Sequence, residues 1–502
     1  MNSADILLSK IQQQIKNTDL SGRFSVRGEI IKLMDGVALV AGLNEARFNE
    51  IVQFSNGIQG LVMDLSRDNV GVLILGNMAQ LEIGDSVEST GEVMSIPLGE
   101  MYLGRVVDGF GQVIDGGAKF DGKYEMGVIE YPAPGVMDRK PVNRPLETGI
   151  KAIDTMIPIG RGQRELIIGD RQTGKTSIIL DTFLHQKNTD VICIYVAIGQ
   201  KNAKVKQISE TLKEYGINEK CIIVNASSSE PAVMQYLAPY VGCRIGEYFR
   251  DRGQDVLIAY DDLSKHAIAY REISLLLHRP PAREAYPGDI FYLHSRLLER
   301  AGQLNETLGG GSLTAFPVVE TLEGDISAYI PTNIISITDG QIFLDMDLFT
   351  SGVKPAIDVG LSVSRVGGAA QSQLMKRFAS KLRVQLANFR ELAKFLQFGS
   401  DIDADTEQQI HQGQIFTELL KQQKYAPIAV YQQIILLYAG INGYLSDMNL
   451  GSISQREKTL LFELETKHKD LISQLKDADT LTPALEKEIK KLIKNTITLD
   501  TV

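Results

Sequence analysis

Residues 169–176 match the pattern GxxxxGK[ST] and read Gly169-Asp170-Arg171-Gln172-Thr173-Gly174-Lys175-Thr176. An apolar run, 166–168, precedes the motif, and an apolar stretch without glycine, 177–183, follows it. A strand, a loop and a helix in this order surround an anion with unpaired backbone N–H groups and the positive end of a helix dipole. We therefore predict a phosphate-binding loop. In it, Lys175 reaches the β- and γ-phosphates and the Thr176 hydroxyl is a ligand of Mg²⁺.

Nucleotide chemistry also requires a carboxylate at the end of a neighbouring strand, which holds the water shell of the metal ion. Residues 255–262 form an apolar run that ends in two acids, Asp261 and Asp262. Asp261 is the first acid after the run. We therefore predict that Asp261 and Thr176 form the metal site.

A third requirement is a group that orients or deprotonates the attacking water. The strand predicted at 191–198 is followed by Gly199, Gln200 and Lys201, at the edge of the sheet where ligands bind. The amide of Gln200 can hydrogen-bond water but cannot accept its proton, whereas a glutamate there could act as a base. The site is therefore better suited to holding MgATP than to hydrolysing it.

Composition narrows the class of protein. The chain has 502 residues and a net charge of −10, with basic and acidic residues interspersed, so we expect no nucleic-acid-binding face. Three distant cysteines without CxxC spacing predict buried thiols in a reducing compartment, and the histidines show no zinc motif. We find neither a signal-peptide core nor an apolar run near the ~20 residues that span a bilayer. Any membrane role would therefore depend on partners.

The pattern along the chain predicts a multidomain protein. Residues 1–22 include an amphipathic helix at 4–16, and 23–96 consist of short β-rich runs separated by Gly-containing turns, which predict an N-terminal β-barrel. In 97–370 apolar strands alternate with helices, as in an α/β P-loop domain of the RecA-like kind. Residues 371–502 predict a C-terminal α-helical domain with long helical stretches at 373–398 and 460–494.

Four more stretches carry a family resemblance. They are PIGRGQREL at 158–166, YDDLSK at 260–265, RPPAREAYPGD at 279–289 and PAIDVGLSVSRVGG at 355–368. Together with the loop they resemble the alpha subunits of bacterial F-type ATP synthases, and the similarity covers essentially the whole chain.

The resemblance implies a location and a set of partners. Alpha subunits alternate with beta subunits in a hexamer around the gamma subunit of the central stalk, and the delta subunit is expected at the N-terminal helix. The assembly is peripheral, at the cytoplasmic face of the cell membrane. It couples ATP synthesis or hydrolysis to a membrane sector that transports protons or sodium ions.

The resemblance also implies roles for single residues. Catalytic beta subunits carry glutamate where this chain has Gln200, and Arg365 matches the arginine finger that alpha subunits supply to the neighbouring catalytic site. Ser362 belongs to the same signature and is expected to shape that interface. A guanidinium beside a γ-phosphate stabilises transition-state charge and contributes ~10³ to 10⁵ in rate.

Further nucleotide contacts are implied around the bound ATP or ADP. Arg171 and Gln172 match additional phosphate and nucleotide contacts, and the adenine surroundings correspond to Phe349, Lys354, Pro355 and Gln422. The chain departs from the family at Lys424, where many relatives have glutamine. It departs again at Asn202-Ala203-Lys204, where relatives commonly have Arg-Ser-Thr.

Three alternative functions remain to be weighed. A catalytic subunit of a related rotary, secretion or flagellar ATPase would need a carboxylate base, which Gln200 does not provide. A nucleotide-free structural subunit would not need the intact loop. A Rho-like RNA translocase would need a basic, aromatic barrel, and this barrel is acidic without clustered aromatic residues.

Overall fold

The computed structural model describes residues 26–396, 404–478 and 480–498. Their contacts divide them into two compact units: the residues up to 94 with 276–278, and 95–275 with those from 279 onward. The helix expected at 4–16 lies outside the described residues. Within the described ranges, no helix has both the length and the apolarity to cross a membrane.

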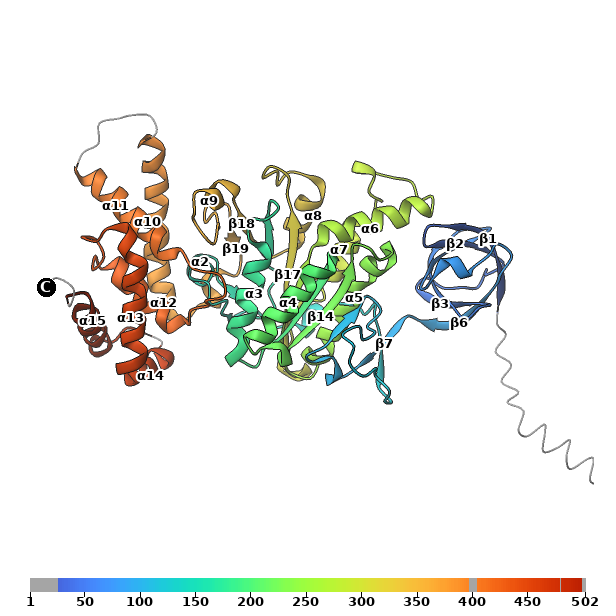
Figure 1. The fold of residues 1–502 in the computed structure, drawn as a ribbon, viewed down its shortest axis with the longest axis horizontal. Coiled ribbons are helices and arrows are strands. Elements are labelled where there is room, and N and C mark those ends of the chain that lie inside the picture. The colour runs from blue at the N-terminus through green and yellow to red at the C-terminus, as the bar shows by residue number, and fades with distance from the viewer. Residues whose placement is uncertain (1–25, 397–403, 479, 499–502) are drawn as a thin grey trace, which may run out of the picture. The chain divides into compact units, whose positions relative to one another are not determined.

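The first unit contains a closed, six-stranded antiparallel barrel, which confirms the predicted β-barrel (Figure 1). The strands are joined in the order β1-β2-β5-β4-β3-β6. Alternate apolar side chains such as Ile30, Val52 and Val72 fill its interior, because successive residues of a strand point to opposite faces. The strands are β1 (Arg27–Met34), β2 (Val37–Ala41), β3 (Glu50–Phe54), β4 (Gln59–Leu65), β5 (Val70–Ile74) and β6 (Ser86–Val93).

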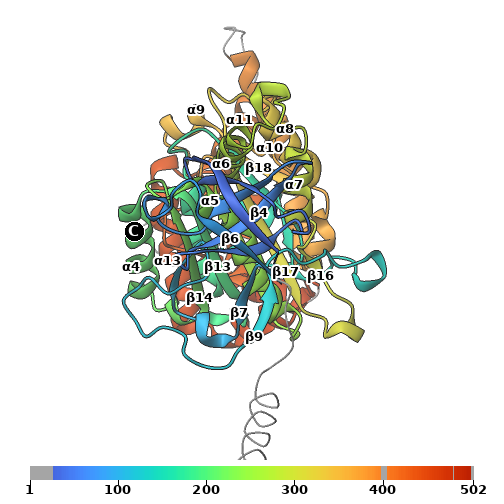
Figure 2. The ribbon, with the colours of Figure 1, turned by 90° about the vertical axis from the view of Figure 1, so that its right-hand side faces the viewer.

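The second unit is built on a nine-stranded sheet (Figure 2). Eight strands follow one another in the order β19-β18-β12-β17-β15-β13-β14-β8, and the ninth, β16, pairs with β17 outside this order. All pairings are parallel except those of β16 and β19. The strands are β8 (Val106–Asp108), β12 (Leu166–Gly169), β13 (Ile192–Gln200), β14 (Cys221–Ser227), β15 (Asp255–Asp261), β16 (Gly302–Gln303), β17 (Ser312–Glu320), β18 (Gly340–Leu344) and β19 (Val363–Ser364). Two small pairs, β7 (Ser95–Leu98) with β9 (Glu125–Val128) and β10 (Pro145–Leu146) with β11 (Ile159–Gly160), lie outside this sheet.

Helices cover both faces of this sheet, so its strands are apolar on both sides. Cys193 and Tyr195 of β13 share a core with α3 and α4, whereas Val196 approaches α5 at Gly242. As predicted, the three cysteines are buried free thiols. The helices are α2 (Lys151–Met156), α3 (Lys175–His185), α4 (Asn202–Glu214), α5 (Ala232–Arg250), α6 (Leu263–Leu276), α7 (Ile290–Leu298), α8 (Tyr329–Ile337) and α9 (Met346–Thr350).

The register of the parallel strands decides which residues meet. Gly169, the last residue of β12, pairs with Glu320 on one side and with Leu344 on the other. Asp261, at the end of β15, pairs with Ala197 of β13. The loop at 169–176, Asp261 and the end of β13 therefore lie at one edge of the sheet, which is its carboxyl edge.

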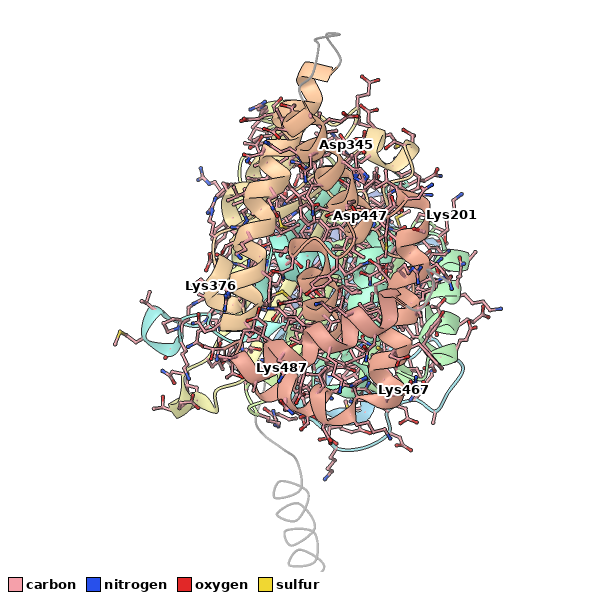
Figure 3. All side chains as sticks on the ribbon, turned by 90° about the vertical axis from the view of Figure 1, so that its left-hand side faces the viewer. Lys201, Asp345, Lys376, Asp447, Lys467 and Lys487 are labelled. Carbon is pink, nitrogen blue, oxygen red and sulfur yellow. The ribbon has the colours of Figure 1, made fainter. Side chains whose placement is uncertain are left out.

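The remaining residues form the predicted helical domain, drawn in orange and red in Figure 1. The stretch 460–494 is not one continuous helical stretch as expected: His468 leaves the helical conformation, and Pro483 begins a new helix, because proline fits only the first turn. Charged side chains such as Lys467 and Lys487 lie on the exposed surface (Figure 3). The helices are α10 (Gln373–Leu396), α11 (Ala404–Leu420), α12 (Val430–Ile441), α13 (Ile453–Lys467), α14 (Lys469–Asp477) and α15 (Pro483–Thr498).

Candidate nucleotide-binding site

The loop of residues 169–176 lies between β12 and α3, as the motif predicts. Gly174 has a φ of 105°, a left-handed conformation that glycine adopts without strain, and it leads directly into α3. The Thr173 hydroxyl donates to the Asp170 carbonyl oxygen at 2.8 Å, and the Thr321 hydroxyl donates to Asp170 Oδ1 at 2.6 Å. The loop is therefore held in shape by a hydrogen bond of its own and by one from Thr321, at a helix N-terminus whose free N–H groups can bind an anion.

Lys175 directs its ammonium group back onto the loop. Its Nζ donates to the carbonyl oxygens of Gly169 at 2.7 Å and of Asp170 at 2.5 Å. Burial lowers the pKa of Lys175, and nearby carboxylates, led by Glu320, oppose that shift. A phosphate in the loop would therefore meet a cation that is already in place.

Asp261 is the centre of a buried polar cluster. The Thr176 hydroxyl donates to Asp261 Oδ2 at 2.9 Å, the Tyr195 hydroxyl donates to the same oxygen, and Gln200 Nε2 donates to Oδ1 at 3.0 Å. The neighbouring acid, Asp262, instead accepts the N–H of Lys265, and burial raises the pKa of Asp262 to about 6. Of the two acids, Asp261 is thus the one whose side chain meets Thr176. A hydroxyl and a carboxylate are hard oxygen donors of the kind that Mg²⁺ prefers, so this pair fits the metal.

Gln200 is oriented by a bulge at the end of β13. The pairing register of β13 with β14 shifts between Ile198 and Gln200, and Gly199 at the bulge has a φ of 59°. The amide of Gln200 is buried: besides its bond to Asp261, its Oε1 accepts from Lys204 Nζ at 3.2 Å. The side chain therefore lies beside the metal-site pair and offers no group that can accept a proton from water.

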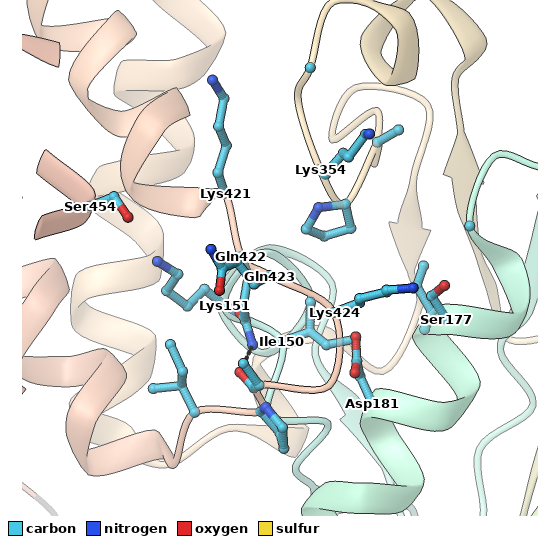
Figure 4. Close-up of a pocket in the computed structure, with 18 of the residues that line it drawn as sticks. Ile150, Lys151, Ser177, Asp181, Lys354, Lys421, Gln422, Gln423, Lys424 and Ser454 are labelled. Carbon is cyan, nitrogen blue, oxygen red and sulfur yellow. Dashed lines mark hydrogen bonds between the residues drawn. The ribbon is translucent and has the colours of Figure 1, made fainter. Parts of the chain in front are cut away.

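A cavity of about 970 Å³ extends from the phosphate loop to the helical domain (Figure 4). Gln172, Thr173 and Gly174 line it at the loop, and Phe349 and Pro355 line it farther away. Lys354 Nζ lies 4.5 Å from the centre of the Phe349 ring, a cation–π contact that closes this part of the wall. The cavity is therefore continuous from a phosphate site to an aromatic side chain suited to a base.

Gln422 shapes the wall of this cavity from within. Its Oε1 accepts the N–H of Lys151 at 2.9 Å, and its Nε2 donates to the carbonyl oxygens of Gly149 at 2.7 Å and Ala426 at 2.8 Å. Both amide hydrogens are therefore used within the protein, so Gln422 anchors this segment of the cavity wall. Its contact with a base stays a prediction. In Figure 4, Lys424 extends from the same segment toward α3, where Ser177 and Asp181 lie.

Arg365 lies away from the loop, whereas Ser362 contacts β18 at Phe343, one residue before the Leu344 that adjoins the loop. Ser364, next to Arg365, pairs with Gly340 at the start of β18, whereas the phosphate loop adjoins Leu344 at the end of that strand. The Ser362 hydroxyl donates to the Asp358 carbonyl oxygen at 2.6 Å and accepts the Phe343 N–H at 2.9 Å. Within the described ranges, Arg365 is exposed and no hydrogen bond or ion pair holds its guanidinium.

Family models match three parts of the chain. The beta-barrel domain of the ATP synthase alpha/beta family matches 24–91, its nucleotide-binding domain 149–364, and the C-terminal domain of the alpha/beta chain 371–496. The chain is 54% identical over 486 residues to ATP synthase subunit alpha of Aquifex aeolicus (strain VF5), covering 97% of this chain and 96% of that one. The chain belongs to the ATP synthase alpha/beta family. Two subunits of the same name from Clostridium botulinum, strains Alaska E43 and Eklund 17B, are 52% and 51% identical, covering 97% of this chain and 95% of each relative.

Two residues of the site in this member of the ATP synthase alpha/beta family were not predicted from the sequence. Tyr195 lies inside an apolar strand and resembles a core residue, yet its hydroxyl reaches Asp261. Lys204 was noted only as a departure, and its ammonium lies 3.3 Å from Asp261 Oδ2. Gln200 ends β13 and Lys204 lies in the first turn of α4, so no regular spacing within one element links the two side chains.

Proposed function

We propose that this chain is the non-catalytic, nucleotide-binding alpha subunit of an F-type ATP synthase. It retains MgATP in its own loop and supplies Arg365 to the catalytic site of the adjacent beta subunit. The observation that carries this proposal is that the loop and Arg365 lie at opposite ends of β18: the loop adjoins its last residue, Leu344, and Arg365 follows the partner of its first residue, Gly340. Such a chain would contact two nucleotides: it would bind one in its own loop and would reach the other, in the neighbouring subunit, through Arg365.

The separation along β18 supports the action of Arg365 on a neighbour. From Gly340 to Leu344 the strand advances about 13 Å at ~3.3 Å per residue, and Arg365 lies just beyond the Gly340 end. A guanidinium stabilises a transferring phosphate only in direct contact. Arg365 is therefore assigned to a phosphate outside its own chain.

The polar cluster around Asp261 supports passive retention of the chain's own nucleotide. Lys175 and the loop N–H groups would hold the phosphates, and Thr176 and Asp261 would hold Mg²⁺, which neutralises phosphate charge when bound. Gln200 supplies an amide where a base would be needed. The carboxylate of Glu320, at the end of β17, is paired with Arg171 at 3.2 Å.

The names of the relatives support the wider assembly. In it the chain would alternate with beta subunits around the gamma subunit, contact the delta subunit through its N-terminal helix, and act at the cytoplasmic face of the cell membrane. ATP synthesis or hydrolysis would then be coupled to proton or sodium transport in the membrane sector.

The experiment that tests the proposal uses the isolated full-length chain. We expect calorimetry to detect MgATP binding and a phosphate-release assay to show turnover at least a thousandfold below the ~10 s⁻¹ of a typical enzyme. The reason is that Gln200 cannot deprotonate water. Rapid hydrolysis by the chain without beta subunits would contradict the proposal.

Ser362→Ala tests how Arg365 is positioned. The substitution leaves the Phe343 N–H without its acceptor and loosens the segment that leads to Arg365, so we expect turnover of the assembled complex to fall roughly tenfold. MgATP affinity of the isolated chain should change much less than turnover, because Ser362 itself does not line the cavity. Unchanged turnover, or a matching loss of affinity, would argue against this role.

A further inference from the structure

Lys204 places a cation at the candidate metal site. Its Nζ lies 3.3 Å from Asp261 Oδ2, the oxygen that also accepts the Thr176 hydroxyl, and 3.2 Å from Gln200 Oε1. The Asp261 side chain is 4% exposed and that of Lys204 is 38% exposed, so the ammonium group reaches a buried carboxylate from the solvent side.

The electrostatics of α4 do not explain why a lysine stands at position 204. Lys204 is in the first turn of α4, where the helix dipole disfavours a positive charge. Lys206 of the same helix, in contrast, forms an ordinary surface pair with Glu210 at 3.8 Å and is 78% exposed. What favours the position of Lys204 is therefore the carboxylate of Asp261.

We propose that Lys204 is a tethered cation that partly substitutes for Mg²⁺ in this chain's nucleotide site. It neutralises Asp261 when no metal is present and lies on the same side of the carboxylate as Thr176, where a phosphate-bound metal would be held. ATP without metal would then still meet two cations, Lys175 and Lys204. This inference rests on the proposed function, because it requires the loop to bind ATP.

Binding with and without metal tests the inference on the full-length chain. We would measure ATP affinity by calorimetry in saturating Mg²⁺ and in EDTA, for the wild type, Lys204→Met and the control Lys206→Met. Without metal, Lys204→Met should weaken ATP binding about tenfold, the loss expected for one hydrogen bond to a charged group. With Mg²⁺ its affinity should stay within about threefold of the wild type, because the metal takes over the charge, and Lys206→Met should match the wild type in both conditions.

Two results would count against specific parts of the argument. An unchanged ratio of the two affinities in Lys204→Met, whether both fall or neither does, would overturn the role of Lys204. Failure of the wild type to bind MgATP at all would instead contradict the proposed function. Lys204→Gln, which keeps a polar side chain without the charge, should reproduce the Met result and separates loss of charge from loss of folding.

Discussion

Arg365→Ala in the assembled complex should lower ATP turnover by ~10³ to 10⁵, the contribution of an arginine finger. That range corresponds to roughly 4 to 7 kcal/mol of barrier. The structure makes the loss specific to turnover. Arg365 is exposed, and within the described ranges no hydrogen bond or ion pair holds its guanidinium, although its charge acts on the buried carboxyl of Glu165. Its backbone N–H donates to the Asp339 carbonyl oxygen at 2.8 Å. Removing the side chain should therefore leave both the fold and the chain's own MgATP affinity intact.

Arg365→Lys is the matched control for charge. Lysine keeps the positive charge but lacks the planar fork that contacts two phosphate oxygens, so most of the loss should remain. Steady-state ATPase assays and gel filtration of the reconstituted complex would measure turnover and assembly together. Normal turnover by Arg365→Ala in an intact complex would remove the basis for the role of Arg365.

Lys175→Ala should weaken MgATP binding by this chain, the property that Arg365→Ala should leave intact. The ammonium contacts two loop carbonyls and would reach the β- and γ-phosphates, and each hydrogen bond to a charged group is worth about 1.5 to 3 kcal/mol. Losing two such contacts should weaken MgATP binding on the order of a hundredfold or more. Calorimetry on the isolated chain measures this directly.

Lys187→Ala serves as the control for Lys175→Ala. Lys187 follows α3 and donates to the Tyr215 carbonyl oxygen, outside the cavity, so its removal should leave affinity unchanged. Undiminished ATP affinity in Lys175→Ala would mean that the loop is not the nucleotide site. Lys175→Ala and Arg365→Ala thus separate nucleotide binding by this chain from catalysis in the adjacent beta subunit.

Local sequence patterns predicted the parts of the site that depend on local structure. The loop motif predicted β12 and α3, and the apolar run before Asp261 predicted β15, because both depend on neighbouring residues in the chain. The contact between Thr176 and Asp261 followed from the rule that parallel strands end at one edge. These predictions required no knowledge of side-chain packing.

Features that depend on distant residues were harder to predict. Tyr195 has the same apolar context as its neighbours, and only the fold shows that its hydroxyl meets Asp261. That Gln422 contacts the base stays a prediction, but the sequence did not indicate that its amide also bonds residues some 270 positions away in the chain. Arg365 has no local pattern at all: the resemblance suggested its role, and the antiparallel pairing of β19 places it far from the loop.

The most direct test of the account is a structure of the complex with beta subunits, bound to ADP and a planar analogue of the transferring phosphate. We predict that the Arg365 guanidinium lies about 3 Å from the analogue in the neighbouring subunit, while the chain's own loop holds an intact nucleotide. A guanidinium directed at its own nucleotide, or away from the neighbour's analogue, would contradict the account.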